Sequence, residues 1–435
     1  MLKNSVPKTV LPVLCFLLVL SSSRAWAIPA FARTTGMGCP ACHNAWPRLN
    51  DFGELYRDRG YRTAPSEDPL WRQLITSVPT SFRVNAGYQY NTTTHQPTDS
   101  GDTTLHSGAF VFPGGDLYFA GALANRVSAY VDIAGFGKDG RASLQSAWGR
   151  INDLVTNWVN VKVGHLELDT PVSSHRNLTL ISPFLIYAYH PVGSTNGFNL
   201  SDNALGVEVM GHSPGPGFRY SVTVGSNGDA GGANLLSAPT LYAHTTYTKL
   251  LRSDIVSRIR VGAFGNIGWL PTQFLTLTPP GGLPVPVLGT GSVARQHSHA
   301  GSDLQLALGP LSTPLTLSVV WMYGQEDTAL VSNATQSARF HGGFVQLDYT
   351  PYLPLTFGGR YDGVYNIQQG DLTLPANSNQ QQAMTLFIRY AVWMAPWGSL
   401  VLHGEVGSTV TENAAIVPTN PVRSTFAFAG LDFLL

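Results

Sequence analysis

One short stretch of this 435-residue chain combines residue types and a spacing that could do chemistry, Cys39-Pro40-Ala41-Cys42-His43. In a C-x-x-C-H motif the two thiols add to the vinyl groups of haem, and the histidine that follows becomes the proximal ligand of the iron. A redox disulfide and half of a zinc site are the alternatives. A disulfide does not need His43, and a zinc ion needs a second ligand pair that this segment lacks. The motif therefore predicts one covalently attached haem c, held by Cys39, Cys42 and His43.

The sixth ligand of that iron is left open by the sequence. Between residues 28 and 81, Met37 is the one other histidine or methionine. Its place beside the proximal side, two residues before Cys39, makes the distal face awkward to reach. A five-coordinate iron is a further alternative. Histidines of the later chain are also candidates, although an ordinary polar role is the simpler interpretation of each: His95, His106, His165 and His403.

The N-terminus has the features of an export signal. Lys3 and Lys8 precede an apolar run over residues 10–20, and Ala25-Trp26-Ala27 forms a small-residue cleavage site. The apolar run is too short to span a bilayer as a helix, which argues against a membrane anchor. The sequence predicts a signal peptide at residues 1–27, cut after Ala27, and an exported mature chain.

Composition narrows the fold class. Only 12% of the residues are charged, about half of the usual share in a soluble domain, whereas 11% are aromatic and 45 are glycine. Basic and acidic residues balance, which gives no indication of nucleic-acid binding. Low charge without a long apolar stretch in the mature chain suits a membrane protein that crosses with strands, because strands need only every second residue to be apolar.

Alternating polarity runs through most of the chain after residue 80. In residues 81–91 (SFRVNAGYQYN) apolar and polar side chains alternate with a period of two. The last stretch, TFAFAGLDFLL at 425–435, alternates up to the terminus, as the closing strand of an outer-membrane barrel does. Comparable segments lie near 116–136, 157–167, 217–225, 240–249, 258–269, 304–324, 340–349, 355–363, 384–393 and 398–407.

These segments predict an all-β fold: an outer-membrane antiparallel β-barrel of about 16 strands with a small N-terminal α-helical monohaem cytochrome segment. A soluble sandwich with one wet face is the alternative. Strand-like segments of about ten residues, aromatic residues near their ends and export without a disulfide framework favour the barrel. The expected division is a signal peptide at 1–27, the cytochrome segment at 28–76 and the porin-like barrel at 77–435. The long interruption at 168–203 suits an extracellular or inward-folded loop.

The residues after the haem motif predict a short amphipathic helix that covers the haem. Pro47 stands at its expected start, Leu49, Phe52 and Leu55 or Tyr56 follow at helical spacing, and Gly60 is its expected stop. A unit of about 45 residues buries little surface alone. It is therefore expected to dock against the barrel or inside it.

The alternation also predicts a basic lumen that would attract haem propionates and the acids Asp51, Glu54 and Asp58 of the N-terminal segment. Its expected inward cations outnumber the expected acids Asp348, Asp362 and Glu405; the cations are Arg83, Lys162, Arg219, Arg258, Arg260, Arg360 and Arg389. A basic lumen would repel a free cation, although porin interiors are commonly lined with arginine. His297 and His299 share one face and are a weak candidate for a transient metal contact. The sequence contains no catalytic triad or phosphate-binding loop that rises above chance.

Residues 28–62 resemble the N-terminal part of the fused cytochrome-porin family of outer-membrane iron(II)-oxidising c-type cytochromes. The resemblance is carried by IPAFAR at 28–33, the haem motif, W-P-x-L-N-x-F-G at 46–53 and Gly60-Tyr61. Over the barrel it is a likeness of architecture and length.

The resemblance implies one haem c and an oxidoreductase that passes electrons from extracellular iron(II) to a periplasmic c-type cytochrome or another soluble carrier. The barrel would lie in the lipid of the bacterial outer membrane, with the cytochrome segment in its lumen or at its periplasmic side. Outward electron transfer to an external acceptor is an alternative, as is a solute porin with a haem-bearing plug.

Overall fold

The structure of the protein, a computed structural model, describes residues 31, 35–63, 80–96, 103–135, 143–226, 239–271, 274–277, 285–288, 294–310, 315–352, 354–395, 398–412 and 421–435. The predicted signal peptide and the domain boundary predicted near residue 76 lie outside these residues. None of the described helices is long and apolar enough to cross a membrane.

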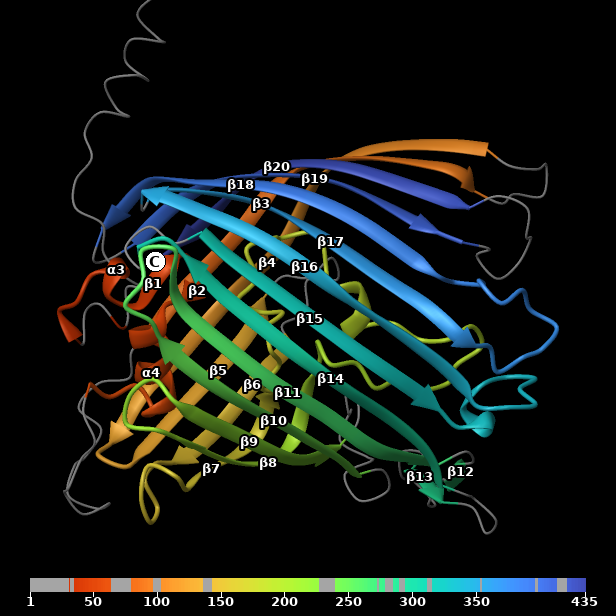
Figure 1. The fold of residues 1–435 in the computed structure, drawn as a ribbon, viewed down its shortest axis with the longest axis horizontal. Coiled ribbons are helices and arrows are strands. Elements are labelled where there is room, and N and C mark those ends of the chain that lie inside the picture. Colours follow the sequence, from red (N-terminus) through yellow and green to blue (C-terminus); the bar gives the residue numbers. More distant parts are fainter. Residues whose placement is uncertain are drawn as a thin grey trace, which may run out of the picture.

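Sixteen antiparallel strands close into one barrel, in which β20 (Val422–Leu434) bonds back to β3 (Thr80–Gln96) (Figure 1). The predicted all-β barrel of about 16 strands is thereby confirmed. A hairpin of β12 (Phe274–Leu277) and β13 (Val285–Leu288) stands outside it. The other barrel strands are β4 (Thr103–Ala124), β5 (Val127–Gly135), β6 (Ser143–Ile151), β7 (Asn160–Glu167), β8 (Asn203–His212), β9 (Phe218–Ser226), β10 (Pro239–Leu250), β11 (Val256–Pro271), β14 (Ala294–Leu308), β15 (Leu315–Glu326), β16 (Ala338–Tyr352), β17 (Leu355–Gln368), β18 (Gln381–Ala395) and β19 (Gly398–Thr411).

The strands place apolar side chains outside and mostly polar ones inside. On β18, Met384 and Ile388 are 57% and 51% exposed, whereas Thr385 and Arg389, on the other face, are buried. Successive residues of a strand point to opposite faces, so one face of β18 forms the outer surface and the other lines the lumen. An apolar exterior over a polar interior is the reverse of a water-soluble protein, and it is typical of a barrel whose outer face meets lipid.

The two ends of the barrel differ in their connections. At one end, here the turn end, β4–β5 and β10–β11 are joined by the short turns 125–126 and 251–255. The other end, here the loop end, carries the long connections 168–202 and 272–293. The alternating segment predicted near 116–136 is in fact two strands, because the chain turns at Asn125 and Arg126, a pair without glycine or proline.

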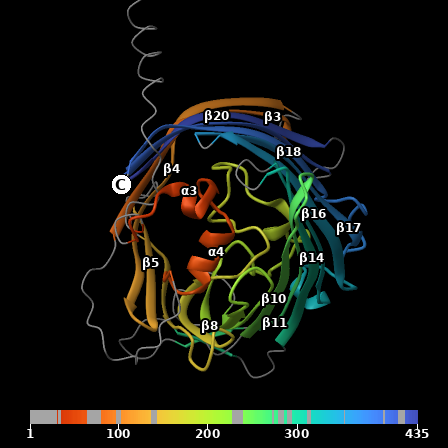
Figure 2. The ribbon, with the colours of Figure 1, turned by 60° about the vertical axis from the view of Figure 1, so that its left-hand side comes forward.

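The N-terminal segment 35–63, here the plug, lies in the mouth of the barrel at the turn end (Figure 2). It consists of α3 (Cys39–Cys42), a hairpin of β1 (His43–Ala45) and β2 (Arg48–Leu49), and α4 (Asp51–Asp58). Pro47 was expected to begin the helix, and this prediction is wrong. Pro47 lies in the hairpin turn, and α4 begins after Asn50, whose side chain caps it by accepting a hydrogen bond from the Gly53 N–H at 2.8 Å.

The end of α4 and its buried face agree in part with the sequence. Gly60 has a φ of +68°, which ends the helix in a conformation that favours glycine, as predicted. Tyr56 is buried, but Phe52 is 37% exposed, so the expected apolar stripe packs only in part.

The connection 168–202, here the inward loop, folds into the lumen, one of the two placements predicted for it (Figure 2). It carries the short helix η1 (Leu185–Tyr187). The Glu405 carboxylate on β19 accepts hydrogen bonds from the backbone of Leu180 (2.8 Å) and Ser182 (2.9 Å). Arg360 on β17 donates to the Ser182 and Pro183 carbonyls at 3.0 and 2.7 Å. These contacts fix the loop to the opposite wall.

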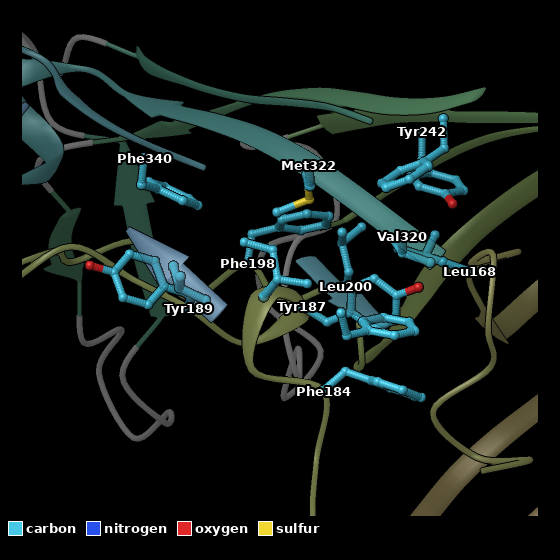
Figure 3. Close-up of a cluster of buried hydrophobic side chains, with 14 of the residues drawn as sticks. Leu168, Phe184, Tyr187, Tyr189, Phe198, Leu200, Tyr242, Val320, Met322 and Phe340 are labelled. Atoms are coloured by element: carbon cyan, nitrogen blue, oxygen red, sulfur yellow. The ribbon is translucent and has the colours of Figure 1, made fainter. Parts of the chain in front are cut away.

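An apolar core lies between the inward loop and the barrel wall (Figure 3). The loop contributes Phe184, Tyr187 and Phe198, and the strands contribute Met322 and Phe340, all buried. The Phe184 ring stacks on Phe344 with centroids 4.3 Å apart. Burial of this many apolar side chains stabilises the loop by several kcal/mol at roughly 1.5–3 kcal/mol each. The inward loop is therefore a packed part of the barrel interior.

Candidate haem-binding site

The C-x-x-C-H motif forms one compact turn that α4 holds in place. The backbone N–H of Asn50 donates to the Cys42 carbonyl at 2.8 Å, and its side-chain amide donates to the Ala41 carbonyl at 3.1 Å. Gly53 on α4 lies so close that a Cβ there would be 2.1 Å from the Cys42 carbonyl oxygen. Glycine at this position is therefore what allows the helix to pack on the motif. Cys42 is a free thiol, whereas the Cys39 side chain lies outside the described part of the chain.

The imidazole of His43 is buried and is oriented by the backbone of Arg48 and Pro47. Its Nδ1 lies 3.0 Å from the Arg48 carbonyl oxygen, which can only accept, so Nδ1 carries the proton. Nε2 is then the nitrogen with a lone pair. Burial lowers the pKa of His43 to about 4, so the ring is neutral at ordinary pH. Metal-bound histidines have this form: a neutral ring with the second nitrogen donating to a carbonyl.

Cys42 and His43 line a cavity of about 270 Å³ between the plug, the wall β3–β8 and the start of the inward loop. Its volume is near the lower end of the range of small-molecule pockets, about 300–1,000 Å³. A row of aromatic rings lines it: Tyr61 stacks near Trp148 with centroids 6.3 Å apart, and Trp148 stacks on Tyr130 at 5.7 Å. Flat aromatic walls suit the faces of a porphyrin.

The same cavity carries cations that could meet the propionates of a haem. Three of them, Arg83, Lys162 and Arg176, are each already paired with a carboxylate of the wall. Arg176 on the inward loop lies 2.9 Å from Glu167, and its side chain remains 34% exposed. The donor set, the tautomer of His43 and the aromatic and cationic lining together fit a covalent haem held by Cys39, Cys42 and His43.

Ion pairs dock the plug to the lumen, and three of them join residues that the sequence had singled out. Arg258 pairs with Asp51, Arg260 with Glu54 at 3.1 Å, and Arg219 with Asp58 at 2.8 Å. The predicted attraction between lumen arginines and plug acids is confirmed for these pairs.

The plug also places a cation of its own on the wall, because Arg48 binds the Asp348 carboxylate of β16 at 2.5 Å. The lumen is less basic than predicted. Three of the predicted inward cations are matched by wall acids that the sequence reasoning did not count: Asp432 pairs with Arg83 and Arg389, and Glu208 pairs with Lys162.

Of the five side chains considered for the sixth ligand, the four that the structure describes do not line this cavity. Met37 is not among its lining residues, and the side chain of His95 lies outside the described residues. His106 is exposed beside Tyr90. His165 shares its strand face with Val163, which is 52% exposed, and so points outward.

His403 faces the lumen, but its ring contacts Arg389 and Glu405 and it does not line the cavity. Two potential ligands that sequence reasoning missed do line it, His175 and Met210. His175 could have been considered because it lies in the long interruption at 168–203. Met210 could have been considered because the alternation of residues 203–212 places it on the inward face.

The histidine pair His297 and His299 lies elsewhere in the barrel. Both rings are buried against Phe198 of the inward loop, with centroids 4.9 and 6.0 Å from it, and His299 Nδ1 lies 2.9 Å from the Asn266 amide oxygen. Within the described ranges, no group of three or more histidine, cysteine or acidic residues is arranged to hold a metal ion. The suggested transient iron contact thus gains no support here.

Comparison with known proteins places the fold. No protein-family model matches the chain, and no curated protein matches it. Among solved structures it is similar to an anion-selective porin from Comamonas acidovorans, with 11% identity and a TM-score of 0.54 over 82% of this chain and 99% of the porin. OmpT of Vibrio cholerae also matches, with 11% identity and a TM-score of 0.46 over 82% and 98% of the two chains. OprB of Pseudomonas putida matches with 10% identity and a TM-score of 0.45 over 82% and 94%. The first likeness shows that the chain has the fold of an outer-membrane porin.

Proposed function

We propose that the protein carries one covalent haem c on Cys39, Cys42 and His43 and conducts electrons across the bacterial outer membrane. Electrons enter from extracellular iron(II) and leave to a periplasmic c-type cytochrome or another soluble carrier, so the protein acts as an oxidoreductase. The observation that carries the proposal is the state of His43. Its buried ring, fixed through Nδ1 by a backbone carbonyl, lies in a C-x-x-C-H turn and lines a cavity inside a closed barrel.

The location rests on the outer face of the barrel. Its apolar side chains suit lipid, and short turns lie on the periplasmic side in barrels of this kind. The turn end, which carries the plug, would therefore face the periplasm and the loop end the cell exterior. A soluble carrier could then approach the plug directly.

The chain's own residues would hold the site. Haem, when bound, supplies one-electron iron chemistry. Asn50 and Gly53 fix the motif against α4, Arg48 orients His43, and the inward loop packs over the lumen. A one-electron transfer needs no general acid or base, in keeping with the absence of such a constellation from the sequence.

The position of the cavity makes electron transfer across the barrel feasible. The apolar band of a barrel is about 25 Å tall, and tunnelling falls off exponentially with distance. A haem lying wholly in the periplasm would be too far from an external donor. The cavity lies inside the barrel, between the plug and the inward loop, which shortens the path to the loop end.

Rapid mixing with iron(II) tests the proposal. The purified, air-oxidised protein is mixed with iron(II) at controlled pH, and the visible spectrum is followed. We expect rapid appearance of the reduced c-type bands, and their loss in a His43→Ala variant. His106→Ala is the matched control, because this exposed histidine lies beside Tyr90 and away from the cavity. Reduction by dithionite but not by iron(II) would contradict iron oxidation and would favour outward electron transfer.

A solute porin with a haem-bearing plug is the second candidate. It is favoured by the fold, because the structure most like this barrel among those compared above is an anion-selective porin. The inward loop and the plug argue against it, since both occupy the lumen. Conductance across planar bilayers separates the two: a plugged conduit is nearly silent, whereas a porin passes ions in proportion to its open lumen.

A further inference from the structure

We propose that His175 of the inward loop is the sixth ligand of the haem iron, opposite His43. This inference rests on the haem site proposed above and names the distal residue that the sequence left open. Among the described residues that line the cavity, only His43, His175 and Met210 are histidine or methionine, the side chains that complete haem c coordination. The choice is therefore between an imidazole on the loop and a thioether on the wall.

The local backbone presents His175 to the cavity. The Ser173 hydroxyl accepts a hydrogen bond from the Arg176 N–H at 3.0 Å and donates to the Glu167 carboxylate at 2.5 Å, which closes a tight turn around the histidine. Ser174, which directly precedes His175, is held as well, because its hydroxyl donates to the Ser201 hydroxyl at 3.0 Å. His175 itself stands exposed at the tip of this turn and faces the cavity. These hydrogen bonds fix the backbone around His175, whereas its imidazole stays exposed and could bind a metal.

Met210 is less suited to that role. It lies within β8, is 3% exposed, and its carbonyl accepts a hydrogen bond from the Asn160 side chain at 3.0 Å. It borders the cavity from the wall, where its low exposure leaves its side chain less free to reach an iron than that of the exposed His175. The lumen histidine His244 is engaged: it contacts Asp169 and Asp303 at 3.1 Å each, and neither ring nitrogen remains for a metal.

The charged groups around His175 come from two strands of the wall and from the inward loop itself. Asp116 on β4 and Glu167 on β7 interact with it electrostatically, and Arg176 follows it in the loop. Ligation by His175 would join the plug to the inward loop through the haem. The haem would then be low-spin with two imidazole ligands, and its reduction potential would be lower than with a methionine ligand.

The test uses the full-length, haem-loaded protein in detergent, with visible spectra and electron paramagnetic resonance of the oxidised form. We expect a low-spin, two-imidazole signature in the unaltered protein and in Met210→Leu. His175→Ala should turn high-spin, and added imidazole should restore the low-spin form. His175→Met should show the sulfur-to-iron charge-transfer band of a methionine ligand and a raised potential. A merely structural histidine would produce neither the rescue nor the new band.

Three results would overturn the inference while leaving the haem proposal intact. One is a low-spin signature that survives in His175→Ala. Another is its loss in Met210→Leu alone. The third is a five-coordinate, high-spin iron in the unaltered protein. Absence of covalent haem on a denaturing gel stained for haem would refute the proposed function itself, and so the two failures are distinguishable.

Discussion

Replacement of Arg219 tests how the plug is held in the barrel. Its guanidinium on β9 lies between two segments: Nε is 2.8 Å from Asp58 of the plug, and the two terminal nitrogens bind Asp169 of the inward loop at 2.5 and 2.8 Å. The Arg219 side chain is 11% exposed, and those of Asp58 and Asp169 are 4% and 11% exposed. Arg219→Gln would leave two carboxylates facing each other in a largely dry site.

The size of the effect follows from the burial of these groups. Removing one partner of a buried ion pair costs about 3–5 kcal/mol, because the other charge stays unpaired. Part of the charge remains compensated, since Arg57 lies 3.2 Å from Asp58 and His244 lies 3.1 Å from Asp169. We therefore expect a cost at the lower end of that range, about 3 kcal/mol. Because about 1.4 kcal/mol changes an equilibrium constant tenfold, this cost raises the undocked fraction of the plug roughly a hundredfold.

Native-state proteolysis measures that fraction. A trypsin-like protease cleaves the plug after Arg57, Arg59 or Arg62 only when it is undocked, and the rate then tracks the population of the open form. Arg252→Gln removes the same charge from an exposed position in the 251–255 turn and serves as control. Cleavage of Arg219→Gln within twofold of the control would refute the assignment of Arg219 as the main anchor.

Two further predictions concern the same plug. Gly53→Ala should increase cleavage of the plug. Alanine is the better helix residue and stabilises α4 by about 1 kcal/mol. Its Cβ would lie 2.1 Å from the Cys42 carbonyl oxygen, however, and would force α4 off the motif at a cost of about 1–3 kcal/mol. Gly197→Ala, with nothing within 4 Å of the new Cβ, should have no effect, and equal behaviour of the two variants would show that the contact is absent. Acid should release the plug only at low pH. Burial raises the pKa of Asp58, but Arg219 and Arg57 outweigh it and lower the pKa from 3.8 to about 2, with a smaller contribution from His212 and an opposing one from Asp169. Its stabilisation is complete above pH 3.8 and is lost as pH falls toward 2, so cleavage by an acid-active protease that begins near pH 6 would contradict the assignment.

Most of the barrel could be predicted from the sequence because its strands alternate with a period of two. Prediction from alternation and turn residues failed where a turn lacks glycine and proline. The pair Asn125-Arg126 turns the chain without glycine or proline, so β4 and β5 looked continuous. Alternation also assigns side chains to faces, which is why the inward arginines were found. Asp432, the wall partner of Arg83 and Arg389, was missed, because pairing between strands depends on register, which one sequence does not reveal.

A haem motif can be predicted from the sequence alone because its chemistry is local, within five consecutive residues. The start of α4 was misplaced because proline was given more weight than the asparagine cap three residues later. The distal side of the site could not be predicted at all. His175 is more than 130 positions from His43 in the chain, and only the inward fold of residues 168–202 brings both side chains to one cavity.

The filled lumen bears on the choice between a conduit and a pore. A solute path along the wall would have to displace the plug, the inward loop or both, and Arg219 ties them together. Opening the path would break a buried network at a cost of about 3–5 kcal/mol and would also expose the apolar core beneath the loop. An electron needs no open path, because it tunnels, and tunnelling is faster through packed protein than across an empty gap of the same length. In the proposed conduit, the same contacts that would hinder a solute would shorten the distance that an electron has to cross between the two ends of the barrel.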